Sequence, residues 1–197
     1  IAGAETVRHI VAAAPAFGVG RLTMFALSSD NLRRPAEEVR GMMLLLESFL
    51  KSETRELVAR GIRLNFIGRR DRVTPSLRRE MRVAEQATIG GQILHLRIAI
   101  DYSSRDAIMN AAETADMDRP LSRQAFAQLI TKQGAEDYRD VDLLIRTSGE
   151  RRLSDFLLWE SAYAELWFTD TLWPDFAPSE LRHAIDDYHK RDRRYGG

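Results

Sequence analysis

The sequence predicts an α/β protein: a single domain with a central, mostly parallel sheet flanked by helices. Short apolar runs of strand length alternate along the chain with longer segments whose apolar residues recur every three or four positions. The strand-length runs are short and predominantly apolar, as parallel sheets that are buried on both faces favour. Because nothing in the 197 residues resembles a linker, we expect residues 1–197 to form one domain.

The first three elements are a helix, a strand and a long helix. Residues 4–14 carry apolar side chains at helical spacing, and a turn with two glycines leads from them into an apolar strand over 22–27. Pro35 is well placed at the start of a helix over 36–59, because proline is favoured in the first turn. Two glutamates soon after Pro35 favour the same start, since acidic groups stabilise the amino-terminal end of a helix.

Glycine and proline also mark the three elements that follow. One glycine ends the long helix, and a second glycine closes the strand over 62–67. Pro75 starts a helix over 76–88 whose apolar residues stay in register. The apolar run over 93–100 is the third predicted strand.

The remaining elements are shorter. Helices over 105–115 and 122–133 precede two short apolar strands, over 141–145 and 166–168. The last helix, over 179–193, again has a periodic apolar stripe. Strands separated by helices are typical of parallel sheets, and ligands of such folds usually bind at the carboxyl ends of the strands.

Composition excludes several classes of protein. The 29 basic and 29 acidic residues balance, so no overall field directs the chain to nucleic acid or to an anionic membrane. The absence of cysteine excludes disulfides, thiolate metal sites and cysteine nucleophiles, and it fits a reducing compartment. No apolar run approaches the roughly 18 residues of a membrane span, and no signal peptide is present. We therefore expect a cytoplasmic protein with at most peripheral membrane contact.

Two polar loops directly follow predicted strands. Residues 28–35 follow the strand over 22–27, and residues 146–154 follow the strand over 141–145. If both strands run parallel, the loops open on the same edge of the sheet. Their arginines, hydroxyls and helix amino terminus would there suit a phosphate-bearing ligand. Alternatively the loops are solvated turns, since Ser, Asn, Asp and Gly favour turns.

Glu165 is a carboxylate within an apolar and aromatic stretch, residues 161–168. A carboxylate is costly in such surroundings unless it is paired or bound to a metal, and we favour a functional role for it. The alternative is that Glu165 points outward from a strand while its neighbours point inward.

Long motifs along the chain carry a family resemblance. They are LTMFALSSDNLRRP at 22–35, RTSGERRLSDFLLW at 146–159, YAEL at 163–166, LWPDF at 172–176 and RDRRYGG at 191–197. These segments resemble the cis-prenyltransferase (undecaprenyl diphosphate synthase) family. The resemblance covers essentially the whole chain in order, and the motifs are long and specific.

The resemblance implies a Mg²⁺-dependent homodimeric enzyme that condenses isopentenyl diphosphate with an allylic diphosphate and releases pyrophosphate. The product would be a cis-polyprenyl diphosphate similar to undecaprenyl diphosphate. The residues matching Ser28 and Asn31 are implicated in removing a proton after bond formation, and Glu165 helps to place the metal. The implied substrate-binding residues are Ser29, Asp30, Leu32, Arg34, Arg146, Arg152, Leu153, Ser154, Arg194 and Gly196. The last two belong to an Arg-x-Gly motif that reaches across the dimer interface.

The residue types agree with this chemistry. Arginine is a planar, permanently charged, bidentate donor, so it suits a diphosphate better than lysine does. Mg²⁺ typically takes one or two carboxylates together with substrate phosphates and water, so a single glutamate is a plausible share of its ligands. Positioned charge that stabilises the leaving pyrophosphate would supply most of the rate.

The sequence also departs from the family pattern. The family opens with an Asp-Gly-Asn-Gly-Arg-Trp motif that carries a metal-binding aspartate. Because the chain starts at Ile1 without a methionine, we expect that motif and an amino-terminal strand to precede it. Leu27 and Leu32 stand where the family usually has Phe and Trp, and Asp-Tyr-Ser-Ser at 101–104 replaces Asn-Tyr-Gly-Gly. These changes leave the allylic substrate and the product length open.

Two other functions are alternatives to the enzyme. A non-catalytic partner subunit would bind an active homologue and supply only the Arg-x-Gly tail. The presence of Arg146, Arg152, Ser154 and Glu165 argues against it, because a purely structural subunit has no need of them. A generic phosphate-binding α/β protein would explain the arginines but would leave the full-length pattern as coincidence.

Overall fold

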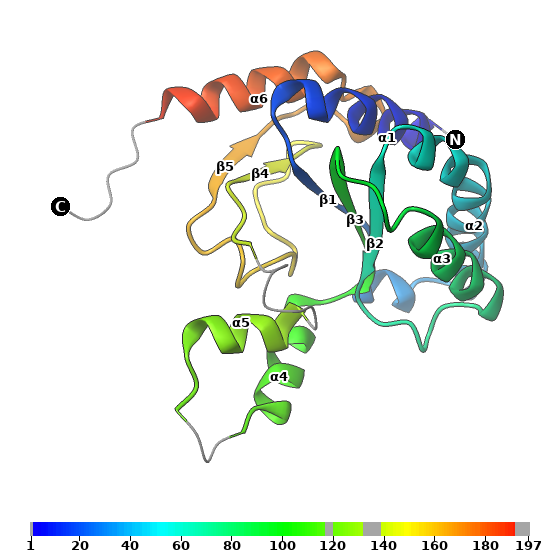
Figure 1. Cartoon of the computed structure of the whole chain (residues 1–197), viewed down its shortest axis with the longest axis vertical. Coiled ribbons are helices and arrows are strands. Elements are labelled where there is room, and N and C mark those ends of the chain that lie inside the picture. Colours follow the sequence, from blue (N-terminus) through cyan, green and yellow to red (C-terminus); the bar gives the residue numbers. More distant parts are fainter. Residues whose placement is uncertain (1, 117–119, 132–138, 192–197) are drawn as a thin grey trace. The chain divides into compact units, whose positions relative to one another are not determined.

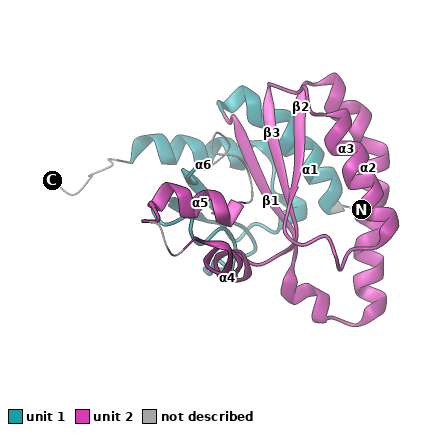
Figure 2. Ribbon diagram, turned by 60° about the horizontal axis from the view of Figure 1, so that its bottom comes forward, with its two compact units in different colours: residues 1–18, 139–197 teal, residues 19–138 magenta. Residues whose placement is uncertain are grey.

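A computed structural model of the chain describes residues 2–116, 120–131 and 139–191 (Figure 1). The chain divides into two compact units, which Figure 2 colours separately. One unit is residues 19–138, and the other combines residues 1–18 with residues 139–197. Each unit contains parallel strands with helices beside them, and each is described here by itself.

The unit of residues 19–138 is built on a three-stranded parallel sheet. Its strands are β1 (Arg21–Ser28), β2 (Ile62–Ile67) and β3 (Leu94–Tyr102), in the order β1-β3-β2. The central strand β3 is buried along its length except at His95, as expected of a strand that is covered on both faces. The carboxyl ends of β1 and β3 coincide, because Ser28 pairs with Tyr102.

This unit has four helices, of which the first two pack on the sheet at β2 and the last two pack on each other. They are α2 (Ala36–Ala59), α3 (Pro75–Ala87), α4 (Ser104–Thr114) and α5 (Arg123–Thr131). Figure 2 shows α2 and α3 side by side along the sheet. Helix α2 buries Met43, Leu50 and Leu57, which repeat every seven residues and so form one stripe.

The other unit joins the two ends of the chain around a two-stranded parallel sheet. Its elements are α1 (Ala2–Ala13), η1 (Ala14–Phe17), β4 (Leu143–Arg146), β5 (Glu165–Phe168), η3 (Trp173–Asp175) and α6 (Pro178–Lys190). The indole Nε1 of Trp173 donates to the carbonyl of Gly3 at 3.1 Å, and the Thr6 hydroxyl donates to the carbonyl of Pro174 at 2.8 Å. These bonds hold α1 against η3.

The predicted fold class is confirmed, since all three strand pairings are parallel and helices flank the sheet. The helix predicted over 36–59 and the strand over 62–67 match α2 and β2. Strand β3 runs two residues past its predicted end. The three short 3₁₀ turns η1, η2 (Ser29–Arg33) and η3 were not predicted, because such turns have no periodicity. The single domain over residues 1–197 stays a prediction.

Two predicted helices reach beyond the described part of the chain. The last residues of the helix over 122–133 and of the helix over 179–193 lie outside the described residues. Within the described ranges, every helix is too short or too polar to cross a membrane.

Gly68 follows β2 directly and lies close to the backbone of β3. Its φ is +105°, and a Cβ built on it would lie 2.1 Å from the carbonyl oxygen of Ile100. A side chain at this position therefore requires both a rare backbone conformation and a shift of β3. This close approach brings the loop after β2 against the carboxyl end of β3.

We expect Gly68→Ala to lower the free energy of unfolding by at least about 2 kcal/mol, because strain and backbone overlap act together. Urea unfolding followed by circular dichroism measures the change. Gly41→Ala is the control, since Gly41 lies inside α2 and a Cβ there meets nothing within 4 Å. That variant should be as stable as the wild type or more stable, because alanine is the better helix former. Equal midpoints for wild type and Gly68→Ala would contradict the close approach.

Candidate active site

The turn after β1 is a capped 3₁₀ turn, η2 (Ser29–Arg33), at the carboxyl edge of the three-stranded sheet. The Oγ of Ser28 accepts the N–H of Asn31 at 3.1 Å, and the Oδ1 of Asn31 accepts the N–H of Ser28 at 3.0 Å. This reciprocal pair is a capping box. The two side chains predicted to act in proton removal are therefore held together in one small unit.

The capping box determines what Ser28 and Asn31 still offer to a ligand. Their side-chain oxygens each accept one backbone N–H, whereas the hydroxyl hydrogen of Ser28 and the amide hydrogens of Asn31 take no part in the cap. These hydrogens are donors of the kind that diphosphate oxygens accept. The acceptor positions that remain on the two side chains are the other lone pairs of their oxygens, which are weak bases.

The other residues predicted in this turn are more exposed. Asp30 forms an exposed ion pair with Arg33, at 3.4 Å, and Leu32 is half-buried. Arg34 ends the turn by donating its N–H to the carbonyl of Asn31. Its guanidinium is 55% exposed and lies 4.0 Å from Glu38, so this contact is weak.

A buried aspartate beside this turn was not among the predicted site residues. The carboxylate of Asp101 has no exposed surface, and it accepts hydrogen bonds from Ser29 and from the guanidinium of Arg72. The sequence did contain a signal, namely a lone acidic residue at the end of an apolar strand. Its partners were not predictable, because Ser29 and Arg72 lie 72 and 29 residues away along the chain.

The loop predicted at 146–154 leaves β4 in the other unit, and its backbone is unusual. Five non-glycine residues of the described chain have positive φ: Asp101, Ser148, Ser154, Asp155 and Leu157. Four of them lie in or just after this loop, and the fifth is the penultimate residue of β3. Backbone conformations of this kind cost about 1–3 kcal/mol each and cluster at functional sites. Their concentration after β4 supports the prediction of a site there.

Hydrogen bonds to the segment after β5 hold the start of this loop. The N–H of Ser148 donates to the carbonyl of Thr171 at 2.8 Å, and the N–H of Gly149 donates to the carbonyl of Thr169 at 2.9 Å. Both bonds lie beyond the last paired residues of β4 and β5 and connect the loop to the segment that follows β5. The polar side chains that follow β4 thus start from a fixed backbone.

The arginines of the loop differ in their surroundings. The Nε of Arg146 is buried and has no hydrogen-bond partner among the described residues, which is costly for a charged group unless a ligand supplies an acceptor. Arg152 is 64% exposed and forms an ion pair with Glu150. Leu153 is half-buried, and Ser154 is exposed. Of the arginines in this loop, Arg146 is therefore the best candidate to bind an anion, because its buried Nε can still donate a hydrogen bond.

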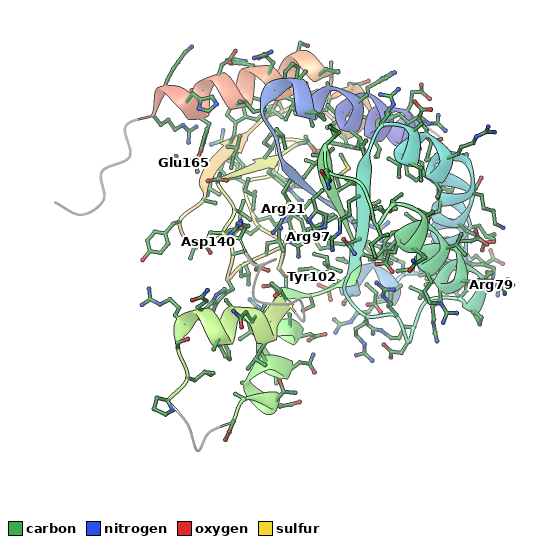
Figure 3. All side chains as sticks on the ribbon, in the orientation of Figure 1. Arg21, Arg79, Arg97, Tyr102, Asp140 and Glu165 are labelled. Carbon is green, nitrogen blue, oxygen red and sulfur yellow. The ribbon has the colours of Figure 1, made fainter. Side chains whose placement is uncertain are left out.

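Glu165 begins β5 beneath the carboxyl-terminal part of α6 (Figure 3). Its Oε2 accepts a hydrogen bond from Nη1 of Arg191 at 2.7 Å, and its side chain is 31% exposed. This carboxylate and that of Asp187 raise the pKa of the Arg191 guanidinium above its ordinary value. The carboxylate of Glu165 is thus compensated by the charge of Arg191, as a carboxylate within an apolar stretch requires.

Glu165 fits a share in a Mg²⁺ site but not a complete one. The hydrogen bond from Arg191 uses a single carboxylate oxygen, and the side chain is accessible. In the described part of the chain, no three acidic or histidine side chains gather as a preformed metal cage. One carboxylate together with substrate phosphates is the arrangement that Mg²⁺ commonly takes.

The predicted site residues therefore fall into two groups, apart from two residues at the end of the chain. Ser28 to Arg34 lie at the edge of the three-stranded sheet, and Arg146 to Glu165 lie in the other unit. Arg194 and Gly196 lie outside the described residues. That the two loops share one edge stays a prediction.

Parallel strands whose carboxyl ends carry arginines, hydroxyls and strained turns define an α/β protein suited to binding phosphate groups. The profile of the family described as "Putative undecaprenyl diphosphate synthase" matches residues 1–196. The chain belongs to this family of prenyltransferases, as the sequence motifs predicted.

Individual relatives agree with this assignment. The chain is 55% identical to Isoprenyl transferase 1 of Bradyrhizobium diazoefficiens over 196 residues, covering 100% of this chain and 79% of that protein. It is 42% identical to a ditrans,polycis-undecaprenyl-diphosphate synthase, specific for (2E,6E)-farnesyl diphosphate, of Xanthomonas axonopodis, covering 99% of this chain and 78% of that protein. The prediction of an isoprenyl transferase is confirmed, in preference to a non-catalytic partner subunit.

A solved structure shows the same fold. It is lavandulyl diphosphate synthase from Lavandula x intermedia in complex with dimethylallyl diphosphate, with a TM-score of 0.92 and 31% identity. The match covers 100% of this chain and 87% of that one.

Proposed function

We propose that this transferase condenses isopentenyl diphosphate with an allylic diphosphate and forms a cis-polyprenyl diphosphate in the cytoplasm. The observation that carries the proposal is Arg146, whose guanidinium Nε is buried at the carboxyl end of β4 and has no hydrogen-bond partner in the described part of the chain. A diphosphate oxygen would supply the missing acceptor. The strained loop after β4 adds Arg152 and Ser154, and we assign these three side chains to the diphosphate of isopentenyl diphosphate.

In this reaction a carbon–carbon bond forms as the allylic carbon loses pyrophosphate, and a proton then leaves the new chain. We assign the diphosphate end of the allylic substrate to the turn of Ser28, Asn31 and Arg34. The Ser28 hydroxyl hydrogen, the Asn31 amide hydrogens and the exposed side chain of Arg34 provide the donors there. Ser29, Asp30 and Leu32 complete this turn. The proton would pass toward the oxygens of Ser28 and Asn31 and onward to pyrophosphate or water, because neither oxygen is basic enough to keep it.

We assign Glu165 to Mg²⁺, which it would hold together with substrate phosphates. When bound, the ion would neutralise the charge that develops on the leaving pyrophosphate. Arg191 would then share Glu165 with the metal, and its link to Asp187 leaves it a second acidic partner.

Labelled isopentenyl diphosphate tests the proposal directly. The full-length protein is incubated with Mg²⁺ and with dimethylallyl, geranyl or farnesyl diphosphate, and the products are sized. We expect elongated products with at least one starter, and we expect EDTA to prevent their formation. Comparing product sizes among the starters gives the preferred starter and the product length. Absence of product with every starter, in protein shown to be folded, would contradict the proposal.

We also propose a homodimer in which Arg194 and Gly196 complete the neighbour's site. A mixture of Arg194→Ala chains with Arg146→Ala chains should then regain activity that neither variant has alone, since one hybrid site carries both intact arginines. Heterodimers are isolated with two different affinity tags before the assay. Inactive heterodimers would show that the tail acts within its own chain.

A further inference from the structure

The carboxylate of Asp101 joins three segments at the carboxyl edge of the three-stranded sheet. Its Oδ1 accepts the Ser29 hydroxyl at 3.0 Å and Nη2 of Arg72 at 2.5 Å, and its Oδ2 accepts Nε of Arg72 at 2.9 Å. Its backbone carbonyl accepts the N–H of Arg69 at 3.0 Å. One residue of β3 thus contacts the turn after β1 and the loop after β2.

Asp101 maintains these contacts at a considerable cost. Its side chain is fully buried, and a buried carboxylate is unfavourable unless charge and hydrogen bonds compensate it. Its φ is +50°, a conformation that few residues other than glycine, asparagine and aspartate adopt. Arg72 supplies the bidentate partner, while 41% of its own side chain faces solvent. An apolar side chain of similar size would fill the same space without these energetic costs. The buried carboxylate of Asp101 is therefore better explained by its contacts than by packing.

The turn that Asp101 contacts needs an anchor from outside. The pairing of β1 with β3 shifts register twice near its end, between Phe25 and Leu27 and between Leu27 and Ser28. The ladder therefore does not by itself direct Ser28, and a five-residue 3₁₀ turn has poor hydrogen-bond geometry of its own. The hydroxyl of Ser29 connects the turn to β3 through Asp101.

We propose that Asp101 is a positioning residue for prenyl transfer: through Ser29 it fixes the turn that carries Ser28 and Asn31, and it orients the guanidinium of Arg72 beside that turn. The hydroxyl of Ser29 then acts on the protein rather than on the substrate. The inference rests on the proposed function, because it assigns the turn to the allylic substrate. It also makes a statement about the turn itself that is testable without turnover.

Asp101→Asn is the first variant, because it keeps the shape and replaces one oxygen by an NH₂ group that cannot accept from Arg72. We expect kcat/KM for the allylic diphosphate to fall about 10-fold or more, the usual effect of losing a charge-assisted hydrogen bond. The KM for isopentenyl diphosphate should stay within about twofold of wild type, since those contacts belong to another loop. A merely structural loss would instead lower kcat through the fraction of folded protein and would leave the KM for the allylic diphosphate unchanged.

Asp71→Asn is the matched control. Asp71 makes a bidentate pair with Arg69 in the loop after β2, but 61% of its side chain is exposed and it does not contact η2. The hydrogen bonds from Arg69 lower the pKa of Asp71 to about 2, so the substitution removes a carboxylate charge at neutral pH. Both kinetic parameters should stay within about twofold of wild type.

Ser29→Ala tests the route and keeps the buried pair of Asp101 with Arg72, so it remains informative if Asp101→Asn does not fold. It should lower the allylic kcat/KM in the same direction. In the Asp101→Asn background it should have less effect than in the wild type, because the same contact is already weakened. Unchanged allylic parameters in folded Ser29→Ala would overturn the proposal.

Hydrogen exchange of the Ser28 and Asn31 amides provides the readout without substrate. Both N–H groups donate within the capping box, so they should exchange faster in Asp101→Asn and in Ser29→Ala than in the wild type. In Asp71→Asn their exchange rates should equal those of the wild type. If the wild type has no transferase activity, the proposed function fails and the exchange rates alone decide on the anchoring of the turn. Unchanged exchange in both variants would overturn that anchoring.

Discussion

Glu165→Gln is expected to lower kcat at least about 100-fold at every Mg²⁺ concentration, because a ligand of the catalytic ion stabilises charge that grows in the transition state. Glutamine has nearly the shape of glutamate but no charge. The variant should therefore fold, and its loss would report on charge and coordination rather than on packing. Steady-state assays across a Mg²⁺ series, with the unfolding midpoint measured in parallel, test this expectation.

Asp187→Asn separates the metal from the ion pair. Arg191 donates to Asp187 at 2.6 Å and to Glu165 at 2.7 Å, so either substitution removes one of its two carboxylate partners. Only Glu165 is assigned to the ion. If the effect of Glu165→Gln came from Arg191, Asp187→Asn would produce a similar loss. A fully active Glu165→Gln would show that the glutamate serves only the ion pair with Arg191.

The second large effect is expected on the KM for isopentenyl diphosphate, from the substitutions Arg146→Ala and Arg152→Ala. Each should raise the KM for isopentenyl diphosphate by roughly 10- to 150-fold, which corresponds to the loss of one charge-assisted hydrogen bond of about 1.5–3 kcal/mol. We expect the effect of Arg146 to be larger, since its Nε is buried and Arg152 is mostly exposed. Initial rates over a range of isopentenyl diphosphate, at saturating allylic substrate, give the values.

Two further variants control this prediction. Arg151→Ala removes an exposed arginine from the same loop and should change the KM by no more than about twofold. Arg146→Lys keeps the positive charge but loses the planar fork and the Nε donor, so most of the loss should persist. Wild-type kinetics in both Arg146→Ala and Arg152→Ala would contradict the assignment of the loop. An equal rise in KM for Arg146→Ala, Arg151→Ala and Arg152→Ala would contradict it as well.

Much of the fold was predictable because its signals are local. Helix α2 matched its predicted bounds, since Pro35 favours its start and Gly61 its end, and the apolar stripe between them has the helical period. The strands of the larger sheet were also predictable, because they are short apolar runs bounded by turn residues. The last two strands were predicted less well, and β4 begins two residues later than expected, at Leu143, because the N–H of Val141 donates to Glu160 outside the ladder.

The sequence by itself determined the class of fold, the family and the types of residue that we propose to bind a diphosphate, because these depend on periodicity and on contiguous motifs. Only the tertiary structure decided which partners the charged groups take. Asp101 meets Ser29 across 72 residues, and Glu165 meets Arg191 across 26. Such pairs leave no periodic trace, since the sheet register and the turn geometry bring them together. The tertiary structure likewise shows that the Nε of Arg146 is buried and lacks a hydrogen-bond partner among the residues that the structure describes.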